Sequence, residues 1–112
     1  MTPTPADIVQ TQLDAYDTGD IDAFLATYAP GIAIYDFPST LIMEGHDQMR
    51  EVYTRVFAAA PDLKTHISPR IAIGDFVIDN ETVTGTADGT PKRVVAIYEV
   101  KEELITKVWF VK

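Results

Sequence analysis

The spacing of apolar residues changes partway along the chain. Up to Pro61 they recur at helical intervals, and from Lys64 onward they alternate with polar or small residues. Helices followed by a run of strands is the element order of an α+β domain. We therefore expect three N-terminal helices packed on a mainly antiparallel sheet.

Each of the three predicted helices has a recognisable start or stop. The first lies between a Thr4 cap and Gly19, and the second follows a cap at Asp20. The third lies between Gly45 and Pro61, where apolar residues fall at i, i+3, i+4, i+7, i+8 and i+11. That third pattern is the clearest amphipathic helix in the chain.

Before the third helix, we expect Tyr28 to belong to the end of the second helix and residues 37–40 to form a loop that follows a short strand.

After the third helix, the sequence predicts antiparallel strands. Asp79, Asn80 and Glu81 form a polar cluster in an otherwise apolar strand, which could be a bulge that presents carboxylates to a pocket; the alternative is a solvated strand edge. The expected strands are residues 32–36, 64–73, 76–85, 93–101 and 104–111.

The last two predicted strands carry apolar side chains on both faces. Val95 and Ile97 alternate with Ala96 and Tyr98, and Trp109 is flanked by apolar neighbours. Helices can cover only one face, so we expect the other to be covered by a second copy in a homodimer. The alternative is a face with exposed β-branched residues.

Composition narrows the class of protein. A chain of 112 residues with 46% apolar and 10% aromatic residues fits a single globular domain, residues 1–112. The net charge of −8 disfavours nucleic acid and membrane surfaces as partners. No apolar run approaches the roughly 20 residues of a membrane span, and residues 1–6 do not resemble a secretory signal. With no cysteine in the chain, we expect a cytoplasmic protein.

The order of several short motifs resembles the nuclear transport factor 2-like superfamily, especially its ketosteroid isomerases and SnoaL-like polyketide cyclases. The resemblance covers nearly the whole chain and implies a cone-shaped α+β barrel, or cystatin-like roll, around one apolar pocket. It also implies a small hydrophobic ligand and isomerase-like or cyclase-like chemistry. The motifs are Gly19-Asp20-Ile21-Asp22, residues 25–29, Ala33-Ile34-Tyr35-Asp36, Glu44-Gly45-His46 with residues 49–53, Val94-Val95-Ala96 and Lys107-Val108-Trp109-Phe110.

Asp36 is the candidate base. It ends an apolar strand beside Tyr35 and Phe37, and a carboxylate held against aromatic surface loses hydration and becomes a better base near neutral pH. The resemblance gives this position the proton-shuttling aspartate of ketosteroid isomerase. The alternative is a turn aspartate that hydrogen-bonds its own backbone before Pro38.

Gln12, Tyr53 and His66 are the candidates for stabilising an oxyanion. The resemblance places Gln12 where the isomerase has a tyrosine, and Ala96 near its protonated aspartic acid, so the isomerase oxyanion hole is incomplete here. Tyr53 matches a pocket tyrosine of the isomerases. Its alternative is a core tyrosine whose hydroxyl reaches water or a carbonyl.

Further aromatic residues are expected to contact the ligand. Core packing is the alternative for the tyrosines and the tryptophan among them. The expected ligand-binding residues are Tyr16, Tyr28, Phe37, Phe57, Tyr98 and Trp109.

No cofactor or metal motif is present in the sequence. His46 and His66 are 20 positions apart and have no His or Cys neighbour, which is not a ligand spacing for zinc. Epoxide hydrolysis in this superfamily needs an Asp-Arg-Asp set with Tyr and Asn. The residue types are present without a spacing that assembles them, as Arg50, Arg55, Arg70, Asp36, Asp79 and Asn80.

Three function classes therefore remain open. The first is a cofactor-independent acid/base enzyme acting on a small apolar carbonyl compound, with Asp36 as base. The second is a dimeric binding protein that holds a small hydrophobic molecule unchanged. The third is an interaction module whose sheet face is the functional surface.

Overall fold

The computed structural model describes residues 2–112. Two strands lie between the second and third helices, so the order is not simply three helices followed by strands. The bounds of the helices and strands are α1 (Pro5–Thr18), α2 (Ile21–Ala26), β1 (Tyr28–Asp36), β2 (Thr40–Glu44), α3 (Gly45–Ala59), β3 (Lys64–Ile73), β4 (Phe76–Thr84), β5 (Lys92–Lys101) and β6 (Leu104–Val111).

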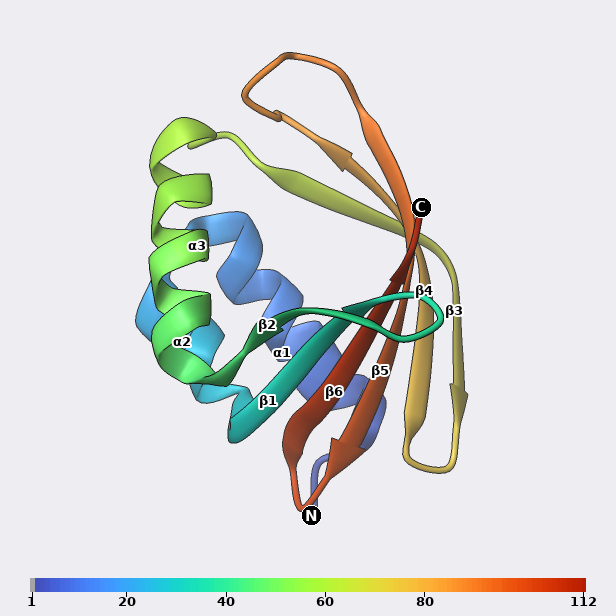
Figure 1. Ribbon diagram of the computed structural model, residues 1–112. Coiled ribbons are helices and arrows are strands. Elements are labelled where there is room, and N and C mark those ends of the chain that lie inside the picture. The colour runs from blue at the N-terminus through green and yellow to red at the C-terminus, as the bar shows by residue number, and fades with distance from the viewer. Residues whose placement is uncertain (1) are drawn as a thin grey trace.

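The strands form a curved six-stranded sheet in the order β2-β1-β6-β5-β4-β3. Neighbouring strands are antiparallel except β1 and β6, which are parallel. The three helices lie on one side of this sheet and leave its other side without helices (Figure 1). The sheet is open rather than closed into a barrel, and the helices complete the cone. This arrangement confirms the predicted α+β class.

Local sequence signals explain the ends of the first two helices. The Thr4 hydroxyl accepts a hydrogen bond from the Asp7 backbone amide, and the Asp7 carboxylate accepts one from the Thr4 amide. Gly19, with φ of 69°, adopts the left-handed conformation that ends α1. Asp20 then caps α2 by accepting from the Ala23 amide. These predicted boundaries are confirmed.

Three local predictions are wrong. Tyr28 begins β1 rather than ending α2, because its backbone pairs with Ile105 of β6. Residues 40–44 form the strand β2, where the sequence predicted a loop that ends at Thr40 and no strand before the third helix, since they pair with the end of β1. The bulge lies in β3, between Ile67 and Arg70, while Asp79 and Asn80 of β4 keep a regular register with β5.

The hydrophobic core fills the space between the helices and the inner face of the sheet. Its largest buried side chains come from every layer and include Phe24, Ile34, Met49, Val77 and Ile105. At the wide end of the cone the helices and sheet diverge. There Gly85 follows β4 with φ of +73° and lies so close to the carbonyl of Asp62 that a Cβ atom would overlap it.

Candidate functional site

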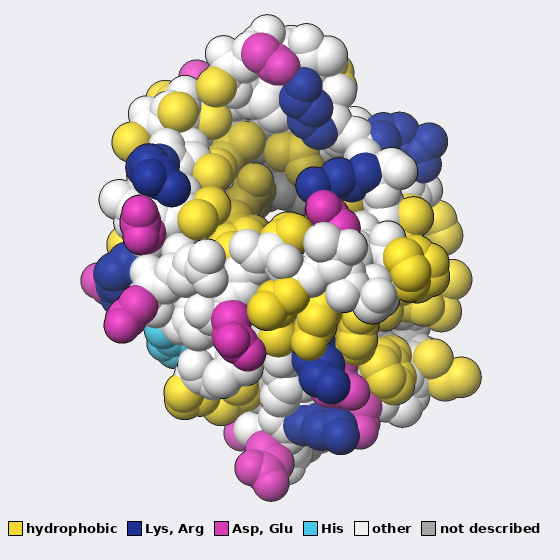
Figure 2. Space-filling view, viewed as in Figure 1, with side chains coloured by type: hydrophobic (Ala, Val, Ile, Leu, Met, Phe, Trp, Pro, Cys, Tyr) yellow, Lys and Arg dark blue, Asp and Glu magenta, His cyan; other side chains and the backbone are white. Residues whose placement is uncertain are grey.

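A cavity of about 630 Å³ opens at the wide end of the cone. This volume lies within the range of roughly 300–1,000 Å³ that holds small organic ligands. Figure 2 shows its opening as a hollow with apolar side chains inside and Lys and Arg side chains beside it. The cavity lies between α1, α2, α3 and the inner face of the strands. Its aromatic lining residues are Tyr16, Phe24, Tyr28, Tyr53, Tyr98 and Phe110.

Glu81 is the only acidic residue that lines this cavity, among the residues the structure describes. Strand alternation places it on the inner face of β4, beside the helices, and its side chain is only 5% exposed. The Tyr98 hydroxyl donates a 3.0 Å hydrogen bond to its Oε2 atom. Burial raises the pKa of Glu81 to about 7, against the opposing effect of the Tyr98 hydrogen bond. A carboxyl group with this pKa can accept or release a proton near neutral pH.

A buried ion pair lies next to Glu81 on the same strand face. Asp79 is completely buried, and both of its oxygens accept from Arg70, at 2.7 Å from Nε and 3.0 Å from NH2. The remaining guanidinium nitrogen donates to Gln10 of α1. The hydrogen bond to Asp79 raises the pKa of Arg70. Neither Asp79 nor Arg70 lines the cavity, so this pair lies beside Glu81 on the inner face and joins β3 and β4 to α1.

The tyrosines of the cavity remain protonated near neutral pH. Burial raises the pKa of Tyr16 to about 12 and raises the pKa values of Tyr28 and Tyr53 as well, with a further contribution from Glu81 in each case. Phe24 holds the rings in place, with its centroid 4.8 Å from that of Tyr53 and 5.1 Å from that of Tyr28. The hydroxyl of each is therefore a hydrogen-bond donor at the cavity wall.

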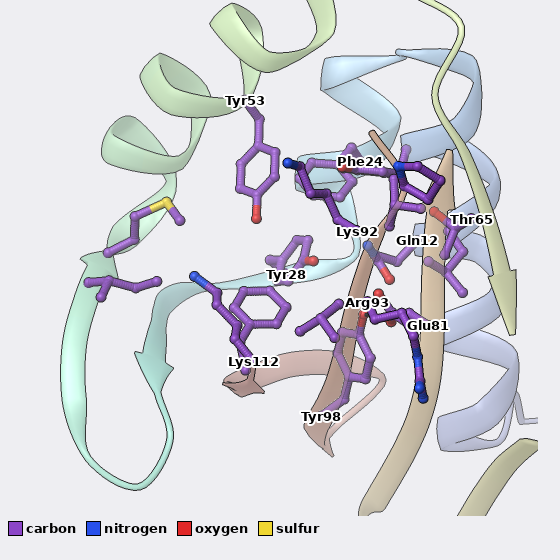
Figure 3. Close-up of a pocket in the computed structure, with 18 residues that line it drawn as sticks. Gln12, Phe24, Tyr28, Tyr53, Thr65, Glu81, Lys92, Arg93, Tyr98 and Lys112 are labelled. Atoms are coloured by element: carbon purple, nitrogen blue, oxygen red, sulfur yellow. Dashed lines mark hydrogen bonds between the residues drawn. The ribbon is translucent and has the colours of Figure 1, made fainter. Parts of the chain in front are cut away.

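Two further polar atoms are buried at the cavity wall without a partner among residues 2–112. They are Oε1 of Gln12 and Oγ1 of Thr65. Gln12 is only 4% exposed, and Figure 3 shows it on the same side of the cavity as Glu81, opposite Tyr53 of α3. Buried polar atoms without partners carry a free-energy cost unless a water or ligand satisfies them. Both atoms are thus polar groups of the wall whose hydrogen-bonding capacity is not met by another residue of the described chain.

Asp36 does not line the cavity. It ends β1 at the sheet edge, where Lys112 lies 3.3 Å from its Oδ1 atom. That oxygen is shielded by the lysine, but the side chain as a whole is 44% exposed. Solvent and a cation therefore replace the aromatic surroundings expected from Tyr35 and Phe37. Asp36 is thus a half-exposed, ion-paired residue outside the cavity lining.

The two histidines lie outside the cavity. His46 donates from Nε2 to the Tyr28 carbonyl at 2.8 Å, which ties the start of α3 to β1. His66 lies 3.3 Å from the Thr84 hydroxyl and does not line the cavity. His66 is therefore not positioned to stabilise an oxyanion there.

The other predicted ligand-binding residues are divided between the cavity and other surfaces. Tyr16, Tyr28 and Tyr98 line the cavity, as do the predicted Gln12 and Tyr53. Phe57 packs against Tyr16 and Phe24 behind the wall. Phe37 is exposed, and Trp109 stacks on Tyr35 away from the helices. Whether these three aromatic residues reach the cavity depends on the strand face or helix side that carries them, and their aromatic character alone does not show this.

Sequence reasoning named Glu81 only as part of the Asp79-Asn80-Glu81 cluster, without assigning it to the pocket, and it did not select Lys92, Arg93 or Lys112. The alternation of Val77, Asp79, Glu81 and Val83 was the available signal for Glu81, because it assigns all four to one strand face. Asn80 points the other way and donates to the Ser68 carbonyl. Of the epoxide hydrolase residue types, the structure brings Arg70 and Asp79 together, outside the cavity lining.

Across residues 2–112, none of the helices has both the length and the apolar character to cross a membrane. In the same residues no three His, Cys, Asp or Glu side chains are grouped to hold a metal ion.

The open mixed sheet, its three helices and the cavity between them define a small α+β protein of the cystatin or nuclear transport factor 2-like fold. The chain belongs to the SnoaL-like domain family, whose model matches residues 9–108. Among curated proteins nothing matches the chain.

Solved structures of the same fold match the chain over most of its length. An uncharacterised cystatin-fold protein from Novosphingobium aromaticivorans has a TM-score of 0.89 and 21% identity, covering 99% of this chain and 100% of its own. A putative polyketide cyclase from Sinorhizobium meliloti has a TM-score of 0.78 and 22% identity, covering 93% of each chain. A protein with a ketosteroid isomerase-like fold from Catenulispora acidiphila, in complex with trimethylamine, has a TM-score of 0.76 and 22% identity, covering 96% of this chain and 85% of that one. At these identities the likeness concerns the fold alone.

Proposed function

We propose that this protein catalyses acid/base isomerisation or cyclisation of a small, largely apolar carbonyl compound, with Glu81 as the proton-transfer group. The observation that carries the proposal is a single buried carboxyl group, with its pKa raised to about 7, inside an aromatic cavity. Such a group is close to half ionised at neutral pH, which suits it both to take and to return a proton. The likeness to a polyketide cyclase and an isomerase-like protein supports the reaction class as an analogy.

The proposed step uses only groups of this chain. The Glu81 carboxylate removes a proton from the carbon next to the substrate carbonyl. The C–H bond breaks, an O–H bond forms on Glu81, and the electron pair moves onto the carbonyl oxygen as an enolate. A donor at the wall, the Tyr53 hydroxyl or the Gln12 amide, stabilises the enolate oxygen. In isomerisation of a substrate with a C=C bond conjugated to the enolate, Glu81 then returns the proton to the far carbon of that bond and the C=O bond re-forms. In cyclisation, the enolate carbon instead attacks a second carbonyl carbon of the same molecule, the π pair of that C=O bond moves to its oxygen, and this oxygen takes the proton from Glu81.

Solvent deuterium exchange tests the proposal without knowledge of the natural substrate. We expect the protein to accelerate exchange at the α-carbons of 2-tetralone or 2-indanone in D₂O, followed by proton NMR. Glu81→Gln should lose about 10²-fold or more of that acceleration, the usual contribution of a general base. Asp36→Asn is the matched control and should retain it. Loss in Asp36→Asn with retention in Glu81→Gln would return the role of base to Asp36.

A non-catalytic binding protein for a small hydrophobic ligand is the second candidate. The hydrogen bond from Tyr98 favours it, because this contact already occupies one Glu81 oxygen. Binding of the ketones without exchange, equally in wild type and Glu81→Gln, would support this candidate over the enzyme.

We further propose that the protein is a homodimer through the outer face of the sheet. A row of apolar residues crosses all six strands on this face, each directly opposite the next. The row includes Trp109 stacked on Tyr35, with ring centroids 5.9 Å apart, and Ile71 at its end is 53% exposed. Continuous apolar surface of this kind is typical of subunit interfaces. The cross-sheet row consists of Leu41, Tyr35, Trp109, Ile97, Ile78 and Ile71.

A further inference from the structure

The mouth of the cavity carries cations although the molecule is strongly acidic. Of the nine Lys and Arg residues in a chain of net charge −8, three line this cavity, namely Lys92, Arg93 and Lys112. A net negative molecule repels anions at long range, so a local cation cluster changes which ligands the opening favours.

Two of these cations are directed at the open part of the cavity. Figure 3 shows the ammonium groups of Lys92 and Lys112 extending over the space toward which the Tyr53 hydroxyl points, whereas the Arg93 guanidinium points away from it. Arg93 instead donates to Asn80 at 2.8 Å. Lys92, Lys112 and Tyr53 therefore surround one region with hydrogen-bond donors and positive charge.

The opposite end of the cavity has different chemistry. Glu81, Tyr98 and Gln12 lie together on the far side in Figure 3, and aromatic rings occupy much of the wall between. The cavity thus has cationic donors at the mouth, an apolar middle and a weak acid at its base. A ligand that matches this order has an anionic end, an apolar body and a carbonyl group at the other end.

The present partners of the two lysines do not prevent binding. Lys92 pairs with Asp88 at 2.7 Å and Lys112 with Asp36 at 3.3 Å, and all four side chains are more than 40% exposed. Such solvent-exposed pairs are weak, because water and salt screen both charges. An ammonium group has three donors, so it can also contact a ligand anion without leaving its carboxylate.

We infer that the cavity selects ligands that carry an anionic oxygen group, a carboxylate or phosphate, which Lys92, Lys112 and the Tyr53 hydroxyl bind at the mouth. This inference rests on the proposed function for the orientation of the ligand, because it places the reacting carbonyl near Glu81. The recognition of the anion itself does not require that any reaction takes place.

Isothermal titration with matched ligands tests the inference. Naphthalene-2-acetate and naphthalene-2-acetamide have the same aromatic body and differ in charge, and naphthalen-2-ylmethyl phosphate distinguishes phosphate from carboxylate recognition. We expect the acetate to bind at least about fivefold more tightly than the amide, a factor that corresponds to roughly 1 kcal/mol. Preference for the phosphate over the acetate would identify a phosphate site.

Variants at the mouth locate the effect. Lys92→Met and Lys112→Met should each weaken the acetate about threefold to tenfold and leave the amide unchanged, since the loss concerns the charge alone. Lys101→Met removes an exposed cation that does not line the cavity and should change neither affinity. Glu81→Gln should retain the preference for the anion, which separates this test from that of proton transfer.

Three results would overturn the inference. They are equal affinity for acetate and amide, equal weakening of both ligands in the lysine variants, and no binding of either ligand at millimolar concentration. If the preference is found but ketone exchange is not, the anion site stands and the enzymatic proposal fails.

Discussion

The Tyr98 hydroxyl and the Glu81 carboxylate form a 3.0 Å hydrogen bond between adjacent strands, inside the cavity. Both side chains are almost fully buried, so the phenol stands in for water as the donor to the carboxylate. The contact favours the ionised form of Glu81, whereas burial favours the neutral form, and burial has the larger effect. The balance between these two influences sets the pKa of Glu81 near neutrality.

Replacing Tyr98 with Phe should therefore raise the pKa of Glu81 above that of the wild type. The variant keeps the ring and removes the donor, and a hydrogen bond to a charged group is worth roughly 1.5–3 kcal/mol, or about one to two pKa units. Carboxyl-carbon NMR titration of Glu81 in both proteins measures the difference. An unchanged or lower pKa in Tyr98→Phe would mean that the hydroxyl does not stabilise the carboxylate.

The pH dependence of stability should show the titration of Glu81. Its pKa is about 7 in the folded state against the ordinary value of 4.5, so between these values the folded state binds more protons than the unfolded state. The free energy of unfolding should therefore fall as pH rises through this window, by roughly 3 kcal/mol in total from this group. Urea unfolding of wild type and Glu81→Gln from pH 4 to pH 8 isolates the effect as a difference.

The free energy of unfolding of wild type minus that of Glu81→Gln should therefore be smaller at pH 8 than at pH 4, because only the wild type loses the contribution of Glu81 as the pH rises. A difference between wild type and Glu81→Gln that is constant with pH would contradict the assignment.

Removing Arg70 should destabilise the fold strongly. Asp79 is fully buried, and Arg70→Met would leave its carboxylate without its bidentate partner. Breaking one side of a buried pair costs about 3–5 kcal/mol, whereas the double variant Arg70→Met/Asp79→Leu replaces both charges with apolar groups and should recover much of that loss. Arg55→Met is the matched control because Arg55 is 70% exposed in its ion pair with Glu51, and its effect should stay within about 0.5 kcal/mol. A small effect of Arg70→Met in urea unfolding would show that the pair contributes little.

A charge in the cross-sheet row should dissociate the proposed dimer. Ile97 lies centrally in that row, between Trp109 and Ile78, and an arginine there would have to be buried in the interface without a partner. Light scattering coupled to size-exclusion chromatography should give a dimer for wild type and a monomer for Ile97→Arg. Thr54→Arg, on the exposed side of α3, should remain dimeric. A monomeric wild type at micromolar concentration would contradict the proposal.

Local signals in the sequence predicted most of the fold. The cap at Thr4, the stop at Gly19 and the apolar spacing of α3 depend on nearby residues, and the structure confirms them. β2 was missed because it is short and mostly exposed, and its apolar residues do not alternate with polar ones, although it pairs with the neighbouring β1. Tyr28 was missed for a different reason: it fits a helical spacing in the sequence, but in the fold it pairs with Ile105 of β6, which is distant along the chain.

The candidate site was harder to predict than the fold. Gln12, Tyr16 and Tyr53 were selected, and all three line the cavity, but the acid at its base was not. Alternation along the strand assigns Asp79 and Glu81 to one face, but only the packing of the helices shows that this face is the inner one and that Glu81, not Asp79, reaches the cavity. The pairing of Asp36 with Lys112 depends on the parallel contact of β1 and β6, which brings the end of the chain beside residue 36. No pattern near Asp36 contains that information.

The carboxyl-carbon NMR titration of Glu81 in the wild-type protein tests the central claim most directly, with Glu81→Gln to assign the resonance. The account predicts a pKa of about 7, so that the group exchanges protons in the range where the protein would act on a carbonyl compound. A value at or below the ordinary 4.5 would show a hydrated or firmly ion-paired carboxylate. Glu81 could not then be the proton-transfer group of this cavity.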